Sequence, residues 1–183
     1  MPRHRHGRAE PEGRDSGPPA DPVAVAREIA LRQLTARSRT RAELERALGS
    51  RGVPPDAAAE VLDRFEELRL VDDAGFAEQW VESRQRAGRS ARVLGQELRA
   101  KGVDAETVTE TLAHLDDESD YRAALAFAHR KVRSLRGVTP QVRDRRLTGA
   151  LARRGFSSPV IRRVLAEVTG GLVEPEECDP AAD

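Results

Sequence analysis

The stretch LGQELRAKGV, from Leu94 to Val103, has two counterparts elsewhere in the chain. It contains two leucines four residues apart, then a basic residue, a glycine and an apolar residue, and the same pattern begins at Leu44 and at Leu147. Leucines at this spacing share one helix face, a cation suits the last turn, and glycine often follows a helix end. Each copy therefore predicts the end of a short helix, and three copies indicate a repeat.

The register continues beyond each glycine, where apolar residues recur at matching positions and predict a further helix. Start signals for helices precede each copy, whereas no alternating strand pattern of useful length occurs. We expect an all-α fold built from tandem three-helix repeats, three units at residues 22–71, 72–117 and 118–169.

Short polar residues mark the expected beginnings of the helices. Thr40 and Glu43 fit a capping box, and the predicted N-caps are Asp21, Thr40, Asp72 or Asp73, Ser90, Asp104, Ser119 or Asp120, and Thr139. At the junction before the second unit, we expect Leu70, Val71 and Phe76 to fill the seam between units. On the preceding helix, Leu68 is expected to share the apolar face of Val61 and Leu62.

Composition suits thin units that each bury one face against a neighbour. Aromatic residues make up 3% of the 183 residues and charged residues 34%, so we expect an elongated molecule rather than one thick core. Residues 1–21 are poor in large apolar side chains and are expected to form a disordered arm, and residues 170–183 an acidic disordered tail. Cys178 is the single cysteine, and no apolar run predicts a membrane span or a signal peptide. The expected compartment is the cytoplasm.

The net charge is zero, but its distribution is uneven. Residues 121–169 hold twelve basic and two acidic residues, a net charge of +10. Such a surface suits phosphates or an acidic protein, and the alternative is a solvated face. The candidate partner-binding residues are Arg130, Lys131, Arg133, Arg136, Arg143, Arg145, Arg146, Arg153, Arg154, Arg162 and Arg163. Among them, Arg143, Arg146, Arg153 and Arg154 are expected to face solvent, opposite the buried leucines.

Catalytic and metal-binding motifs are missing from the sequence. His114 and His129 have no nucleophile or paired carboxylate at motif spacing, and no phosphate-binding loop, dinucleotide fingerprint or HExxH occurs. Asp72 and Asp73 could be proposed as a metal-binding pair, but helix capping explains them. We expect no enzyme activity, no cofactor, no metal and no small-molecule substrate.

One candidate function is direct binding to single- or double-stranded DNA, as the alternative to binding a protein partner. Three-helix units can hold a helix-turn-helix, and the short glycine turn within each unit is compatible with one. The few aromatic residues disfavour a dedicated single-strand binder, which usually stacks bases on aromatic rings.

The junction and the repeat together resemble the RecX family of regulatory proteins, the modulators of the RecA recombinase. The matching residues are Leu70, Val71, Asp72, Asp73, Phe76 and Ala77, followed by Arg84, Gly88, Leu94, Leu98, Lys101, Gly102 and Val103. The similarity covers roughly residues 24–168, nearly everything outside the two tails.

This resemblance implies a curved array of three-helix repeats without catalysis of its own. It further implies binding in the groove of the RecA filament and restraint of filament growth, ATP hydrolysis and strand exchange, in homologous recombination, DNA repair and the SOS response. Whether the basic unit faces acidic protein or filament-bound DNA stays open.

Overall fold

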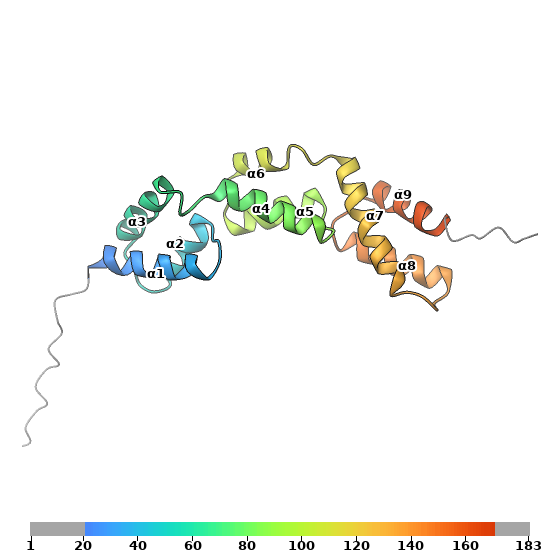
Figure 1. The fold of residues 1–183 in the computed structure, drawn as a ribbon, viewed down its shortest axis with the longest axis horizontal. Helices are drawn as coiled ribbons and strands as arrows, with labels where there is room; N and C mark the ends of the chain where they lie inside the picture. The colour runs from blue at the N-terminus through green and yellow to red at the C-terminus, as the bar shows by residue number, and fades with distance from the viewer. Residues whose placement is uncertain (1–20, 171–183) are drawn as a thin grey trace, which may run out of the picture.

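The computed structural model describes residues 21–170, which form an elongated array of helices bent into an arch (Figure 1). Within this part of the chain there are nine α-helices and no strands. The helices are α1 (Pro22–Ala36), α2 (Arg41–Gly49), α3 (Pro55–Glu67), α4 (Asp73–Arg86), α5 (Ala91–Lys101), α6 (Ala105–Leu112), α7 (Asp117–Arg133), α8 (Pro140–Ala152) and α9 (Ser158–Gly170). The predicted all-α class and the repeat are confirmed.

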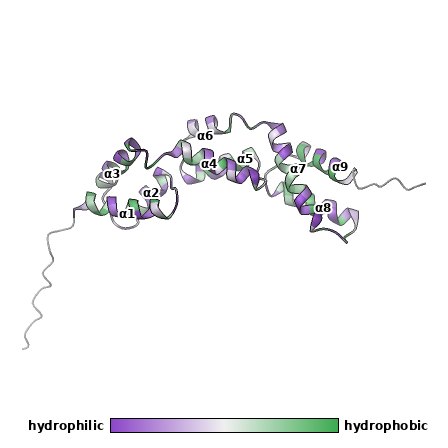
Figure 2. Ribbon diagram, viewed as in Figure 1, coloured by the Kyte–Doolittle hydropathy of each residue, from purple (hydrophilic) through white to green (hydrophobic). Residues whose placement is uncertain are grey.

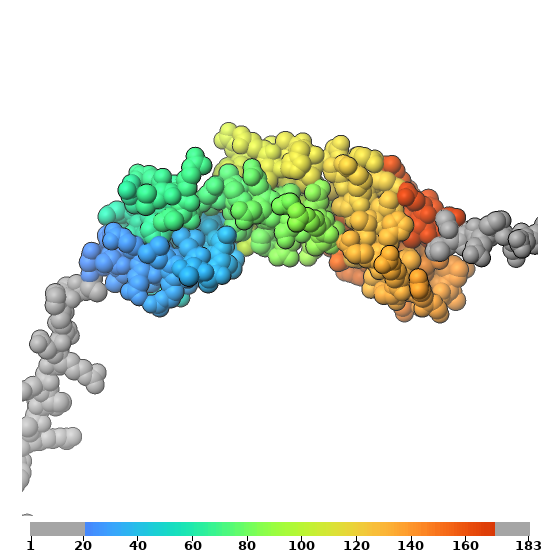
Figure 3. Space-filling model, in the orientation of Figure 1, coloured from blue at the N-terminus to red at the C-terminus, as the bar shows by residue number. Residues whose placement is uncertain are grey.

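The helices pack in threes, and each group has a hydrophobic core of its own. Helices α1–α3 enclose one cluster of buried side chains, α4–α6 a second and α7–α9 a third. We call these groups units 1, 2 and 3. They follow one another along the arch (Figure 3), and hydrophobic and hydrophilic residues intermix along the helices, as expected where each helix buries one face (Figure 2).

The paired leucines of the repeat are the centre of each core. All six are fully buried, namely Leu44, Leu48, Leu94, Leu98, Leu147 and Leu151. Because aromatic residues are scarce, leucine, valine and alanine fill most of the remaining space in every unit. The sequence prediction for these positions is confirmed.

The same hydrogen bond closes the leucine helix in every unit. The carbonyl oxygen of the second leucine accepts from the amide five residues later, joining Leu48 to Val53, Leu98 to Val103 and Leu151 to Phe156 at 3.2–3.4 Å. The intervening glycines have φ values of 77–88°, as a Schellman ending requires. Helices α2 and α8 end three residues before the glycine, slightly earlier than expected, because a tight turn occupies these residues.

Most predicted N-caps are confirmed. Side-chain oxygens of Asp21, Thr40, Asp72, Ser90 and Asp104 accept from the first turn of their helices. Thr139 is at the N-cap position but makes no side-chain capping bond. The prediction for α7 was wrong, because Asp116, rather than Ser119 or Asp120, caps it, accepting from the Ser119 amide at 2.8 Å.

Two leucines at the junction between units 1 and 2 are not buried as predicted. Leu68 is 51% exposed and Leu70 is 47% exposed, whereas Val71 and Phe76 fill the seam. Arg69 lies between the two leucines with a φ of 54°, in the left-handed region. The chain therefore turns sharply after α3, and the turn leaves both leucines at the surface.

Candidate partner-binding surfaces

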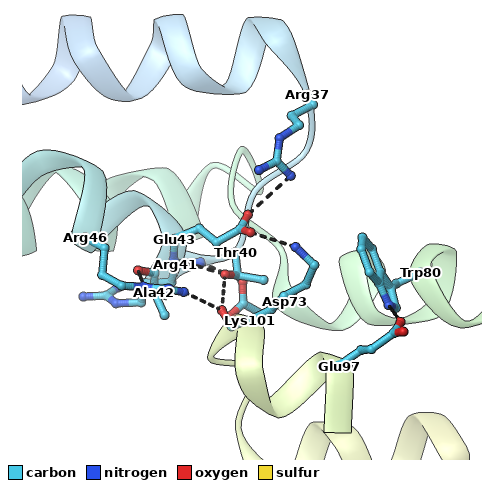
Figure 4. A network of polar contacts seen from close by, with 10 residues as sticks. All are labelled: Arg37, Thr40, Arg41, Ala42, Glu43, Arg46, Asp73, Trp80, Glu97 and Lys101. Carbon is cyan, nitrogen blue, oxygen red and sulfur yellow. Dashed lines mark hydrogen bonds and ion pairs between the residues drawn. The ribbon is translucent and has the colours of Figure 1, made fainter. Parts of the chain in front are cut away.

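The seam between units 1 and 2 is held by backbone groups as well as side chains (Figure 4). The Thr40 hydroxyl donates to the Lys101 carbonyl oxygen at 2.7 Å, and the Asp73 carboxylate accepts from the Arg41 amide at 2.9 Å. The Lys101 ammonium donates to Glu43 at 2.7 Å. Unit 2 therefore caps the N-terminus of α2 in unit 1.

Electrostatics at this seam follow from burial and pairing. Burial raises the pKa of the Asp73 carboxyl, although the hydrogen bond from Arg41 opposes the rise. Burial also acts to raise the pKa of Glu43, but the hydrogen bond and charge of Lys101 outweigh it, so the pKa of Glu43 is lowered. The Glu43–Lys101 ion pair is shielded from solvent, with each side chain less than one-fifth exposed.

A cation-rich aromatic layer lies beside this network. The Lys101 ammonium is 4.3 Å and the Arg84 guanidinium 4.4 Å from the centre of the Trp80 ring. Trp80 also stacks on Phe76 and donates from its indole nitrogen to Glu97 at 3.0 Å. Such cation–π contacts contribute about 0.5–2 kcal/mol each, so the layer stiffens α4 against α5.

The second seam repeats the construction of the first. The Asp120 carboxylate accepts from the Ala91 amide at 2.8 Å, and the Ser90 amide donates to the Arg154 carbonyl oxygen at 3.1 Å. The Arg154 guanidinium lies 3.7 Å from the centre of the Phe127 ring, matching Lys101 over Trp80. Gly88, buried with a φ of 80°, packs against the same phenylalanine.

Seven of the residues that carry the family resemblance, taken as candidate structural or binding residues, gather at the two seams or next to them. These residues are Asp72, Asp73, Phe76, Arg84, Gly88, Lys101 and Gly102. Asp72 caps α4, and the other six make the seam and ring contacts described above or, for Gly102, approach Ala42 of unit 1 closely. Their contacts within the chain are those of residues that join repeats.

Sequence reasoning missed the contribution of unit 1 to its seam. Thr40 and Ser90 are fully buried polar residues at matching positions, and both face the next unit. Glu43 was assigned to a capping box, yet its carboxylate pairs with Lys101 across the seam and with Arg37 of its own unit. The one usable signal was the recurrence of a hydroxyl residue at the same repeat position.

Four of the eleven predicted cations line one groove on unit 3. Lys131 at the end of α7, Arg145 and Arg146 of α8, and Arg153 at its C-cap surround a groove of about 580 Å³. The three arginines are exposed and form no ion pair with any described residue. We call these four residues and their groove the basic groove. Its unpaired positive charge suits an anionic partner.

The other predicted cations lie elsewhere. Arg143 does not face open solvent as expected, because its side chain is 18% exposed and pairs with Asp144 at 3.1 Å. Arg163 pairs with Glu118 at 2.7 Å and lies over Tyr121. The remaining exposed cations outside the groove are Arg130, Arg133, Arg136 and Arg162.

Arg154 was also expected to face solvent, but it is partly buried at the second seam. Burial lowers the pKa of its guanidinium, and the positive charges of Arg89, Arg130 and Arg153 lower it further. Positive charge therefore accumulates where unit 3 meets unit 2. The Arg130 guanidinium also spans this seam, donating to the Arg86 carbonyl oxygen at 3.3 Å.

Neither histidine in the described part of the chain adjoins a catalytic arrangement. His114 and His129 are both exposed, and among residues 21–170 no group of three His, Cys, Asp or Glu side chains is placed to hold a metal ion. None of the described helices is long and apolar enough to cross a membrane.

The fold and seams define a tandem three-helix repeat protein, and comparison with known proteins gives its family. The models for the first, second and third three-helix domains of RecX match residues 26–65, 72–112 and 117–165. The chain belongs to the RecX family of regulatory proteins.

Named relatives and solved structures agree with this assignment. The chain is 46% identical over 151 residues to the regulatory protein RecX of Streptomyces coelicolor, covering 82% of this chain and 80% of that one. It is 50% identical over 139 residues to that of Mycolicibacterium vanbaalenii, covering 72% and 76%. The crystal structure of RecX from Lactobacillus salivarius has the same fold, with a TM-score of 0.68 at 22% identity over 82% of this chain and 98% of that one.

Proposed function

We propose that this protein binds filaments of the RecA recombinase and inhibits filament extension, ATP hydrolysis and strand exchange, acting in the cytoplasm without catalysis of its own. Membership of the RecX family supports the proposal. The structural observation that carries it is the arch of three units joined by ordered seams, with unpaired cations at one end (Figure 1). Such a shape can contact several neighbouring protomers of a filament at once.

The second candidate is a DNA-binding protein that acts on DNA directly. The basic groove favours it, because unpaired arginines next to one another suit successive phosphates. Under this candidate, RecA would be affected only through competition for the same DNA.

The deciding experiment measures the single-strand-DNA-dependent ATP hydrolysis of RecA at fixed RecA while this protein is titrated in. Binding to the same DNA without RecA is measured alongside, at several salt concentrations. Inhibition well below the concentration of RecA, and below the concentration that coats naked DNA, is expected for a filament-directed regulator. Inhibition only when the DNA is saturated, with an affinity that falls steeply with salt, would instead favour the direct DNA binder.

A further inference from the structure

A groove crosses the seam between units 1 and 2, on the side where the end of α1 meets α4. Its volume is about 490 Å³, and it is lined by apolar side chains of both units together with two arginines. The lining residues that matter here are Leu31, Leu34, Leu70, Phe76, Arg39 and Arg69. We call this the seam groove.

The apolar part of the seam groove is exposed. Leu31 is 44% exposed and Leu70 is 47% exposed, and they are two of the four large apolar residues exposed in residues 21–170. The left-handed backbone at Arg69, a residue that rarely adopts it, holds Leu70 in this position. The amides of Leu70 and Val71 both donate to the Phe65 carbonyl oxygen, at 2.8 and 3.2 Å, and fix the turn. The turn is thus a Schellman ending of α3, like those of the repeat helices, and it presents Leu70 to solvent beside the groove.

The polar part of the seam groove lacks partners. Neither Arg39 nor Arg69 forms an ion pair with another described residue, and the buried Nε atom of Arg39 has no hydrogen-bond acceptor. An adjoining hollow, which shares Phe76 with the seam groove, adds Arg37 and Arg84. These arginines place positive charge around the apolar floor, and the one carboxylate in the lining, Asp72, accepts from the Gly75 amide as the N-cap of α4.

The second seam shows that the repeat geometry alone does not produce this chemistry. The second seam has a hollow at the matching position. In this hollow Gln85 replaces the Leu34 of the seam groove, and Ala123 replaces Phe76. Leu115 is its one large apolar residue, His114 stands in the place of Arg69, and Arg86 and Arg122 also line it. Arginines therefore line both hollows, and the exposed leucines Leu31 and Leu70 distinguish the first seam.

We propose that the seam groove binds an acidic segment of a partner protein that carries leucine- or phenylalanine-sized side chains, with its carboxylates on the arginines and its apolar side chains on Leu31 and Leu70. Charge complementarity selects this occupant, because unpaired arginines beside an apolar floor favour carboxylates next to apolar groups. This inference rests on the proposed function, in which a protomer of the RecA filament presents the segment.

The test uses RecA filaments assembled on single-stranded DNA with a slowly hydrolysed ATP analogue, and measures binding of the full-length protein. The groove variant is Leu31→Glu with Leu70→Glu. The control is Val25→Glu with Leu68→Glu, which makes the same changes at exposed positions of α1 and the junction outside the groove. The groove variant is expected to bind at least about tenfold more weakly, as lost apolar burial and added charge repulsion predict, and the control within about twofold of the original protein.

A second variant removes charge without touching the apolar floor. This variant is Arg39→Gln with Arg69→Asn, because asparagine tolerates the left-handed backbone at position 69. It should also weaken binding about tenfold. Circular dichroism verifies the helical content of each variant. Unchanged binding by both folded groove variants would overturn the seam groove while leaving the proposed function intact. Failure of the original protein to bind filaments would overturn both.

Discussion

The three repeat glycines share one backbone conformation but have different surroundings. Their φ values lie between 77° and 88°. A Cβ atom on Gly102 would overlap the Ala42 side chain, and one on Gly155 would overlap Val93 and Ser90 of the preceding unit. A Cβ atom on Gly52 would meet nothing within 4 Å, because no unit precedes unit 1 in the described array. Glycine therefore ends a helix in all three units and permits close approach between units in two.

This difference predicts unequal costs for the same substitution. Gly52→Ala should destabilise the protein by about 1–2 kcal/mol, the cost of a left-handed residue with a Cβ. Gly102→Ala should cost clearly more, because unit 1 must also move away. Urea denaturation followed by circular dichroism measures both. Equal costs would show that the seam is loose enough to accommodate a methyl group.

The buried seam carboxylates predict a dependence of stability on pH. Because burial raises the pKa of Asp73 above its usual 3.8, the folded state holds this proton more tightly than the unfolded state. Ionisation therefore lowers the free energy of unfolding as pH rises through the raised pKa. Asp73→Asn keeps an oxygen acceptor for the Arg41 amide, so its stability relative to the original protein should increase between pH 3.5 and pH 7.

Asp104→Asn is the matched control for this experiment. Hydrogen bonds from Thr107 lower the pKa of Asp104, so its contribution to stability is present above its unfolded-state pKa and is lost as pH falls. The relative stability of this variant should decrease between pH 3.5 and pH 7, opposite to that of Asp73→Asn. Denaturation curves at both pH values give the two differences, and parallel trends would refute the assignment.

At the scale of elements, the helices were predictable because their signals are local. In the repeat helices a cap, a leucine pair and a closing glycine lie within one helix length, so the sequence alone located these helices well. The start of α7 was harder, since Asp116, Asp117, Ser119 and Asp120 are all competent caps within five residues. Asp120 instead accepts from the Ala91 amide across the second seam, and Asp116 caps the helix.

The candidate surfaces were less predictable because they depend on contacts between distant residues. The charge of unit 3 was visible in the sequence, but the burial of Arg154 is determined by Phe127 and the second seam. The hydrogen bond from Thr40 to Lys101 joins residues 61 positions apart, and no local sequence pattern predicts it. Leu70 was expected to fill the seam between units, whereas the backbone turn at Arg69 leaves it exposed.

At the scale of the whole molecule, one backbone-to-carboxylate bond recurs between neighbouring units. In units 1 and 2 the first residue of the leucine helix, Arg41 or Ala91, donates its amide to an aspartate of the next unit. Unit 3 has Pro140 at this position, which has no amide hydrogen to donate. Within residues 21–170 this bond therefore joins unit 1 to unit 2 and unit 2 to unit 3.

The arch presents its basic groove on unit 3, and charge reversal there tests what the groove contacts. Arg145→Glu, Arg146→Glu and Arg153→Glu change only exposed side chains that pair with no described residue. Arg154 is left in place, because its guanidinium packs on Phe127 and its loss would disturb the second seam. The triple variant should keep its helical content and melting temperature, yet lose most of its inhibition of RecA ATP hydrolysis.

The matched control reverses Arg133, Arg136 and Arg162, which are exposed on the same unit but outside the groove. Both triple variants lower the net charge of residues 121–169 from +10 to +4, so a difference between them reflects position rather than total charge. The control should retain inhibition, because long-range attraction is largely screened at physiological salt. Equal loss of inhibition in both variants would mean that unit 3 acts through its overall electrostatic field. Full inhibition by the groove variant would remove the basic groove from the contact and leave the seam groove as the remaining candidate surface.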